Sequence, residues 1–125
     1  MSILKPFKGI RPRKDIVHKV AALPYDVMSS EEARSMVKDN PYSFLHVDKA
    51  EIDLDTSINL YDKRVYEKAK ENLNQMMADG IYIKDHEPYL YIYKLIMDDR
   101  EQVGIVGCTS IDEYQNNLIR KHELT

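Results

Sequence analysis

The feature that most constrains the fold is one amphipathic segment running from Leu60 to Asp79. Apolar residues recur in it at steps of three and four, which is the spacing of one face of an α-helix. These residues are Tyr61, Val65, Ala69, Leu73 and Met76. Gly80 follows directly and suits the left-handed position that commonly ends a helix. We therefore predict a long helix over residues 60–79 that buries one face.

A second helix is predicted from its start and stop signals. Ser29 is followed three residues later by Glu32, the spacing of a capping box. Asn40-Pro41 stops the helix, because proline cannot continue the hydrogen-bond ladder. We expect this helix between Ser29 and Asn40.

Short apolar runs predict the strands. Residues 20–23 indicate a buried edge strand and residues 43–47 another strand, while the acidic segment 48–59 is expected to form a solvated loop. Residues 89–97 are apolar on both faces, which favours a central strand. The short polar turn 98–101 then predicts antiparallel pairing with residues 103–111.

Two glycines and a histidine in the predicted strands could have either a structural or a ligand-binding role. Gly104 and Gly107 favour a sheet bulge or a close backbone approach over a phosphate-binding loop, because their spacing matches no nucleotide fingerprint. His46 and Asp48 share a face of the predicted strand, but two ligands do not specify a metal. We therefore predict no metal site and take His46 as a histidine at the edge of the core.

These elements predict an α+β fold, a mainly antiparallel sheet with two principal helices packed on it, in one domain over residues 1–125. The net charge of −3 makes DNA an unexpected partner, because phosphate binding needs an excess of Lys and Arg. The single cysteine excludes an intrachain disulfide. The chain shows neither a secretory leader nor an apolar run long enough to cross a bilayer, so we expect a cytoplasmic protein without membrane contact.

Candidate site residues lie at three places. Asp26, in the loop Pro24-Tyr25-Asp26, could act as a base or orient a ligand hydroxyl, although a turn carboxylate that caps a backbone N–H is the commoner outcome. Arg11 belongs to a basic patch that could meet phosphates or form a solvated surface.

The third place is the C-terminal cluster. His122 beside Glu123 suits acid–base chemistry, and Arg120 and Lys121 suit a phosphate, with Thr125 nearby; the alternative is a solvated charged segment. Such a cluster usually sits inside a domain, so we expect the chain to be the N-terminal part of a longer protein.

Several segments in fixed order resemble a known family. They are 6–12, 24–27, 31–34, 40–47, 106–114 and 119–125. The chain resembles the prokaryotic family of unknown function that is often labelled SpoOJ/ParA/ParB/RepB, and the resemblance covers nearly its whole length. It implies a ParB-like protein whose longer relatives carry a His- and Arg-containing phosphate box, which this sequence lacks.

The resemblance implies a nucleotide- or phosphate-binding small-molecule enzyme, incomplete here, of the phosphotransferase kind. Asp26 and residues 120–125 would line its cleft, with ATP, ADP or CTP as cofactor of the full-length protein. Two alternatives stay open: a DNA-associated partition or regulatory module, and a structural or oligomerisation domain without chemistry. A small-molecule substrate and a homo-oligomer are the partners we expect, and whether the chain is an enzyme is left open.

Overall fold

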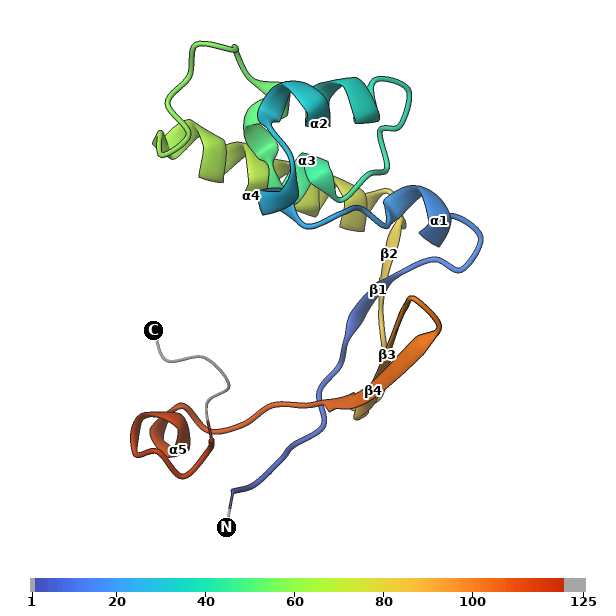
Figure 1. The fold of residues 1–125 in the computed structure, drawn as a ribbon, viewed down its shortest axis with the longest axis vertical. Helices are drawn as coiled ribbons and strands as arrows, with labels where there is room; N and C mark the ends of the chain where they lie inside the picture. Colours follow the sequence, from blue (N-terminus) through green and yellow to red (C-terminus); the bar gives the residue numbers. More distant parts are fainter. Residues whose placement is uncertain (1, 121–125) are drawn as a thin grey trace. The chain divides into compact units, whose positions relative to one another are not determined.

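The computed structural model describes residues 2–120, and they divide into two compact units. One unit comprises residues 10–83, and the other combines residues 2–9 with residues 84–120. Within the described residues, five α-helices and two two-stranded sheets are present, which confirms the α+β prediction. Figure 1 shows the order of these elements along the chain.

Residues 10–83 form the helical unit. Its elements are β1 (Ile10–Pro12), α1 (Val17–Val20), the 3₁₀ turn η1 (Tyr25–Val27), α2 (Ser30–Val37), α3 (Leu45–Asp48), the 3₁₀ turn η2 (Ala50–Asp53), α4 (Lys63–Ala78) and β2 (Tyr82–Lys84). β1 and β2 pair with each other and form the first sheet. Figure 1 shows α2, α3 and α4 gathered around one another, with α4 the longest.

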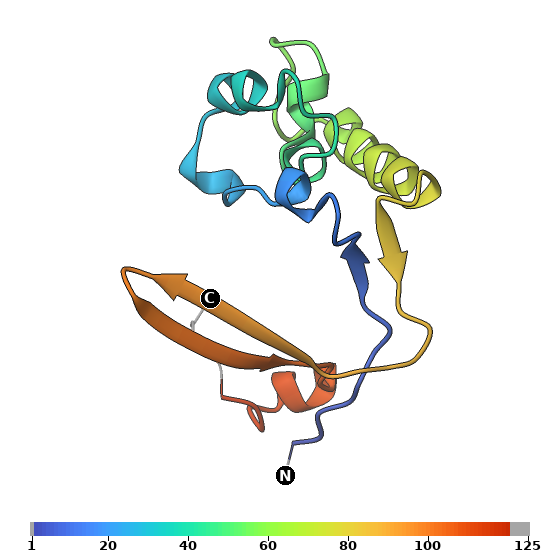
Figure 2. The same ribbon diagram turned by 90° about the vertical axis from the view of Figure 1, so that its right-hand side faces the viewer.

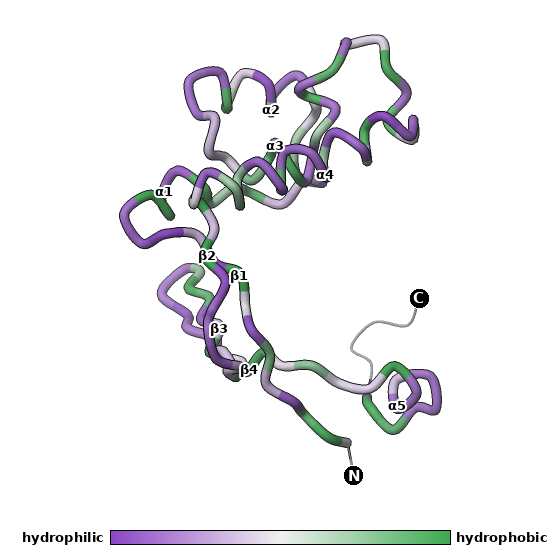
Figure 3. The backbone as a smooth tube through the Cα atoms, turned by 180° about the vertical axis from the view of Figure 1, so that it is seen from behind, coloured by the Kyte–Doolittle hydropathy of each residue, from purple (hydrophilic) through white to green (hydrophobic). Residues whose placement is uncertain are grey.

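The predicted long helix is confirmed as α4, and both of its ends have identifiable caps. Asp62 accepts a hydrogen bond from the Arg64 backbone N–H at 2.9 Å, so the helix begins at Lys63. The Arg64 guanidinium beside it lowers the pKa of Asp62 to about 2. At the other end Gly80 has φ of +70°, and the Ile81 N–H bonds the Met76 carbonyl at 3.0 Å, as in a Schellman motif. Figure 3 shows hydrophobic and hydrophilic stretches alternating along α4.

The predicted capping box is confirmed at the start of α2. The Ser29 side chain accepts from the Glu32 N–H at 3.2 Å, and the Ser29 N–H donates to the Glu32 carboxylate at 2.7 Å. The Ser29 backbone N–H and the Ser29 hydroxyl both donate to the Glu32 carboxylate, and these two hydrogen bonds lower the pKa of Glu32 because they favour its charged form. The helix ends at Val37, before the stop signal at Asn40-Pro41.

Two predicted strands are wrong. Residues 20–23 contain the last residue of α1 and then irregular backbone, and residues 43–47 lead into α3 instead of a strand. Both runs are too short to show a period, so their apolar residues could not distinguish a strand from one buried helical turn. The predicted solvated loop 48–59 contains η2, where Glu51 and Ile52 are buried.

The core of the helical unit consists of two small clusters. The first joins α2, α3 and η2 through Ala33, Val37, Leu45 and Ile52. The second joins Val20, Met76 and Ile81, with Phe44 and Tyr82 packed against it. Leu45 is 1% exposed and is the largest fully buried side chain in the described residues. The single turn α3 therefore supplies the centre of the packing.

The second unit is built on a hairpin of β3 (Tyr91–Met97) and β4 (Arg100–Val106), followed by α5 (Ile111–Gln115). Figure 2 shows β3 and β4 running side by side as a two-stranded ribbon. Asp98 and Asp99 link them with positive φ angles of 48° and 61°, as in a type I′ turn. The predicted antiparallel pairing is confirmed.

Three details of that prediction are wrong. Among the described residues β3 pairs with β4 alone, so it is not a central strand. β4 ends at Val106, and residues 111–115, of which the first is the predicted end of the strand, form a helix capped by Ser110. Gly104 lies directly opposite Tyr93 in regular register, so it does not form a bulge.

The N-terminal segment is fastened to the base of the hairpin. Lys5 pairs with Cys108 and Phe7 with Tyr89 in isolated antiparallel bridges. The Tyr91 hydroxyl accepts from the Gly9 N–H at 2.6 Å and donates to the Asp85 carboxylate at 2.6 Å. A Cβ on residue 9 would lie 2.5 Å from that hydroxyl, so the close approach requires glycine.

Candidate functional site

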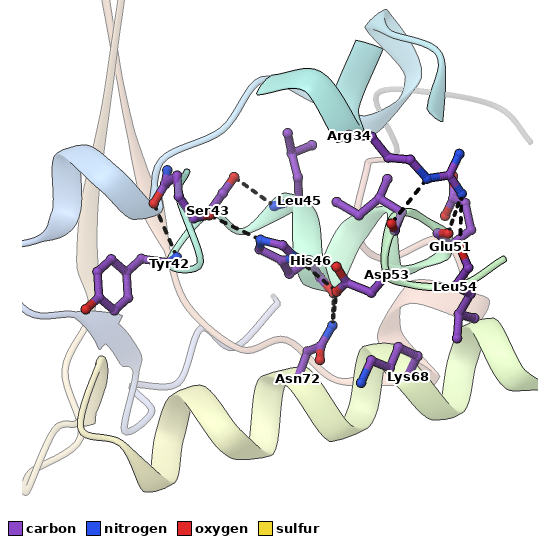
Figure 4. Close-up of polar contacts among 12 residues, drawn as sticks. Arg34, Tyr42, Ser43, Leu45, His46, Glu51, Asp53, Leu54, Lys68 and Asn72 are labelled. Atoms are coloured by element: carbon purple, nitrogen blue, oxygen red, sulfur yellow. Dashed lines mark hydrogen bonds and ion pairs between the residues drawn. The ribbon is translucent and has the colours of Figure 1, made fainter. Parts of the chain in front are cut away.

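The most connected polar group of the helical unit is a polar junction formed by His46, Asp53 and Asn72 (Figure 4). His46 Nδ1 lies 2.9 Å from both carboxylate oxygens of Asp53. The Asn72 side-chain amide donates to Asp53 at 2.8 Å and to the His46 carbonyl at 2.6 Å. The junction therefore ties α3, η2 and α4 together.

Both ring nitrogens of His46 make contacts within the helical unit. Its second ring nitrogen, Nε2, faces the Asn40 carbonyl at 3.1 Å. Both ring nitrogens of His46 therefore lie within hydrogen-bonding distance of oxygen atoms of the protein itself, which favours a structural role. The side chain is 15% exposed, so His46 is the core-edge histidine that the sequence indicates, with Asp53 and not Asp48 as its partner.

A buried charge pair supports η2 from the other side. Glu51 accepts a hydrogen bond from Ser30 Oγ at 2.8 Å and lies 3.5 Å from Lys49 Nζ. The Lys49 and Glu51 side chains are 12% and 8% exposed. Arg34 donates to the backbone carbonyls of Glu51 and Ile52 at 2.8 and 3.2 Å (Figure 4). These contacts satisfy the carbonyls that end the 3₁₀ turn.

A polar groove of about 470 Å³ runs beside the junction. Its lining comprises Pro41, Tyr42, His46, Asp53, Lys68, Asn72, Gln75, Met76, Asp79 and Ile81. Lys68 pairs with Glu71 at 3.1 Å, and Gln75 donates to Asp79 at 2.8 Å. Most polar groups of this groove are thus engaged with one another, which favours a structural role.

A second hollow of about 440 Å³, here called the tyrosine pocket, is more enclosed than the polar groove. It is lined by Tyr25, Val47, Asp48, Lys49, Ala50, Glu51, Leu60, Tyr61, Val65, Tyr66 and Ala69. These residues come from η1, α3, η2, the loop before α4 and α4 itself. The three tyrosines keep 59%, 85% and 59% of their surface exposed, so their rings are not consumed by core packing.

The charged residues that line the tyrosine pocket differ in whether they form ion pairs. Lys49 Nζ pairs with Glu51 and also donates to the Tyr25 carbonyl at 3.2 Å. Asp48 forms no ion pair with any residue in the described range 2–120. Partial burial raises the pKa of Asp48, because desolvation disfavours the carboxylate. The pocket therefore combines aromatic walls with one unpaired acid.

The structure places the residues predicted from sequence in separate units. Asp26 lies in η1 and Arg11 in β1, both exposed and both in the helical unit. Arg120 is exposed and belongs to the other unit. Lys121, His122, Glu123 and Thr125 lie outside the described residues. Their proposed roles in acid–base and phosphate chemistry stay predictions.

Sequence reasoning missed the tyrosine pocket. Tyr61 fits the helical period of α4, yet it precedes the helix and is 85% exposed. Asp48 and Lys49 lie in a segment whose charge suggests a solvated loop. The available signal was Tyr25, which stands beside the candidate Asp26 and itself lines the pocket.

Residues 2–120 contain no group of three or more His, Cys, Asp or Glu side chains arranged to hold a metal ion. No helix among them is long and apolar enough to cross a membrane.

Comparison with known proteins corrects the resemblance. No curated protein and no solved structure matches the chain. The family model that matches residues 4–125 is not a ParB or SpoOJ model, so the ParB-like identification is wrong, and the nucleotide chemistry that it implied loses its basis. Because the matching model spans nearly the whole sequence, the chain belongs to the family described as protein of unknown function (DUF1015).

Proposed function

We propose that the helical unit binds a small organic molecule in the tyrosine pocket. The observation that carries this proposal is a partly enclosed hollow of about 440 Å³ lined by three exposed tyrosines. Small-molecule sites in proteins typically measure about 300–1,000 Å³ and combine aromatic walls with a few polar groups. The tyrosine pocket meets both conditions.

The framework around the pocket supports the proposal, because it holds the walls in place. Glu51 and Lys49 fix η2 at one side, and Val65 of α4 is buried beside the lining tyrosines. The polar junction ties α3, η2 and α4 together through hydrogen bonds of 2.6–2.9 Å. A pocket with rigid walls loses little conformational entropy on binding.

Removing two tyrosine rings is expected to weaken binding strongly without unfolding the protein. In the double variant Tyr61→Ala/Tyr66→Ala, the pocket loses two aromatic walls, and each ring is at least 59% exposed, so the core stays intact. Aromatic side chains dominate the energetics of such contacts, and we expect affinity to fall by at least about tenfold. The measurement is ligand-observed NMR with a library of drug-like fragments, followed by mapping of the hits on the amide spectrum.

Tyr93→Ala is the matched control, because this tyrosine is 58% exposed and lies on the hairpin of the other unit. It should retain every fragment that wild type binds. The proposal fails if fragments bind the double variant as well as wild type, or if their amide shifts map away from the residues of the pocket.

We also propose self-association through the hairpin as a second function. One face of β3 and β4 carries Ile92, Ile96, Val103 and Ile105, which are 61–79% exposed. The remaining residues of that face, Lys94 and Glu101, form an ion pair at 2.6 Å. An isolated two-stranded hairpin is marginally stable at best in water, so a covering partner would stabilise it.

Replacing the cross-strand pair Ile92 and Ile105 by threonine should remove this association. Four aliphatic side chains bury roughly 60–120 Å² each, well under the ~800 Å² per partner of stable complexes, so we expect weak self-association. Sedimentation velocity over a range of concentrations should show a rising mass for wild type and a constant monomer mass for the variant. A wild-type protein that stays monomeric at high concentration would contradict this second function.

A further inference from the structure

We infer that the ligand of the tyrosine pocket is an organic cation with a compact apolar body, such as an alkylated ammonium. This inference rests on the proposed function, because it names the chemical class that the same pocket accepts. It follows from the charges that line the pocket, from their pairing, and from the type of ring that surrounds them.

The first step is the charge balance of the lining. Its charged residues are Asp48, Lys49 and Glu51. Lys49 and Glu51 lie 3.5 Å apart with side chains 12% and 8% exposed, so they neutralise each other inside the protein wall. The unpaired charge that remains on the described lining is the carboxylate of Asp48.

The second step concerns what this carboxylate lacks. Asp48 is the last residue of α3 and is exposed, but neighbouring groups partly desolvate its carboxylate and raise its pKa. A positive group beside it would replace the hydration that the carboxylate has lost, whereas an anion would be repelled by its charge.

The third step concerns the rings. Tyr25, Tyr61 and Tyr66 line the same hollow. The face of an aromatic ring is electronegative and attracts cations, and quaternary ammonium groups are recognised in this way. An anion would meet these ring faces and Asp48 together, and Lys49 could serve it only by leaving Glu51 and the Tyr25 carbonyl.

A pair of isosteres tests the charge directly. Choline and 3,3-dimethyl-1-butanol have nearly the same shape, but only choline carries a positive charge. NMR titrations of the intact chain should show choline binding about tenfold more tightly than its neutral analogue, as expected for a cation against partly desolvated rings. The shifted amides should be those of the pocket residues.

Three variants assign the effect to the named groups. Asp48→Asn should weaken choline binding about fivefold and leave the neutral analogue unchanged, since it removes charge and keeps shape. Tyr66→Phe should retain choline binding because the ring remains, whereas Tyr66→Leu should lose most of it. Glu67→Gln is the control: it removes an exposed acid of α4 that pairs with Lys63 and does not line the pocket.

The outcomes separate this inference from the proposed function. Equal binding of choline and its neutral analogue, or preferential binding of acetate or inorganic phosphate, would overturn the cation class while leaving a binding pocket. The same holds if choline fails to bind while neutral fragments occupy the pocket. If no fragment of any charge binds there, the proposed function fails together with the inference.

Discussion

Replacing Leu45 by alanine is expected to destabilise the helical unit by about 3 kcal/mol, within the range of about 2–5 kcal/mol for buried Leu→Ala changes. Leu45 is 1% exposed and packs against Ala33, Val37 and Ile52. Two of these neighbours sit on α2 and one on η2. The cavity left by the substitution would therefore loosen three elements at once.

Urea denaturation followed by circular dichroism measures this effect. Met36→Ala is the matched control, because Met36 belongs to α2 and is 55% exposed. Alanine is a better helix former, so the control should lie within about 1 kcal/mol of wild type. If both variants unfold at the same urea concentration, Leu45 is not the centre of the core.

Replacing Glu51 by alanine is expected to cost a comparable 3–5 kcal/mol, because it leaves a buried lysine without its counter-ion. Lys49 is 12% exposed and lies 3.5 Å from the Glu51 carboxylate. Ser30 would lose its hydrogen-bond acceptor in the same step. Most of the loss in stability therefore comes from leaving Lys49 and Ser30 without partners, and less of it from losing the attraction between Lys49 and Glu51.

Two further variants identify the cause. Glu67→Ala breaks the exposed pair with Lys63, whose side chains are 87% and 59% exposed, and should cost less than about 1 kcal/mol. The double change Lys49→Met/Glu51→Leu removes both charges and should recover most of the stability. If the double variant is as unstable as Glu51→Ala, the loss comes from packing and not from an unpaired charge.

The sequence predicts the elements whose signals are local. The period of α4, Gly80 after it and the capping box of α2 depend on residues within a few positions of one another, and all three are confirmed. The antiparallel pairing of β3 with β4 is also local, because two residues join the strands. How many strands flank β3 depends on distant segments, which explains why its two-sided apolarity suggested a central strand.

The tyrosine pocket could not be predicted for a related reason. Tyr25, Asp48 and Tyr61 are far apart in sequence and meet only because η1, α3 and the loop before α4 pack together. The strand that the sequence predicts at 43–47 would direct His46 and Asp48 to a common face. In α3 they line different hollows, since His46 borders the polar groove and Asp48 the tyrosine pocket.

The polar groove and the tyrosine pocket are lined by different side chains of the same three elements, α3, η2 and α4. Tyr66 and Ala69 of α4 border the tyrosine pocket, and Lys68 and Asn72 of the same helix border the polar groove. α3 and η2 likewise contribute residues to both. The two hollows therefore share one wall, and a substitution that shifts α4 is expected to change the shape of both.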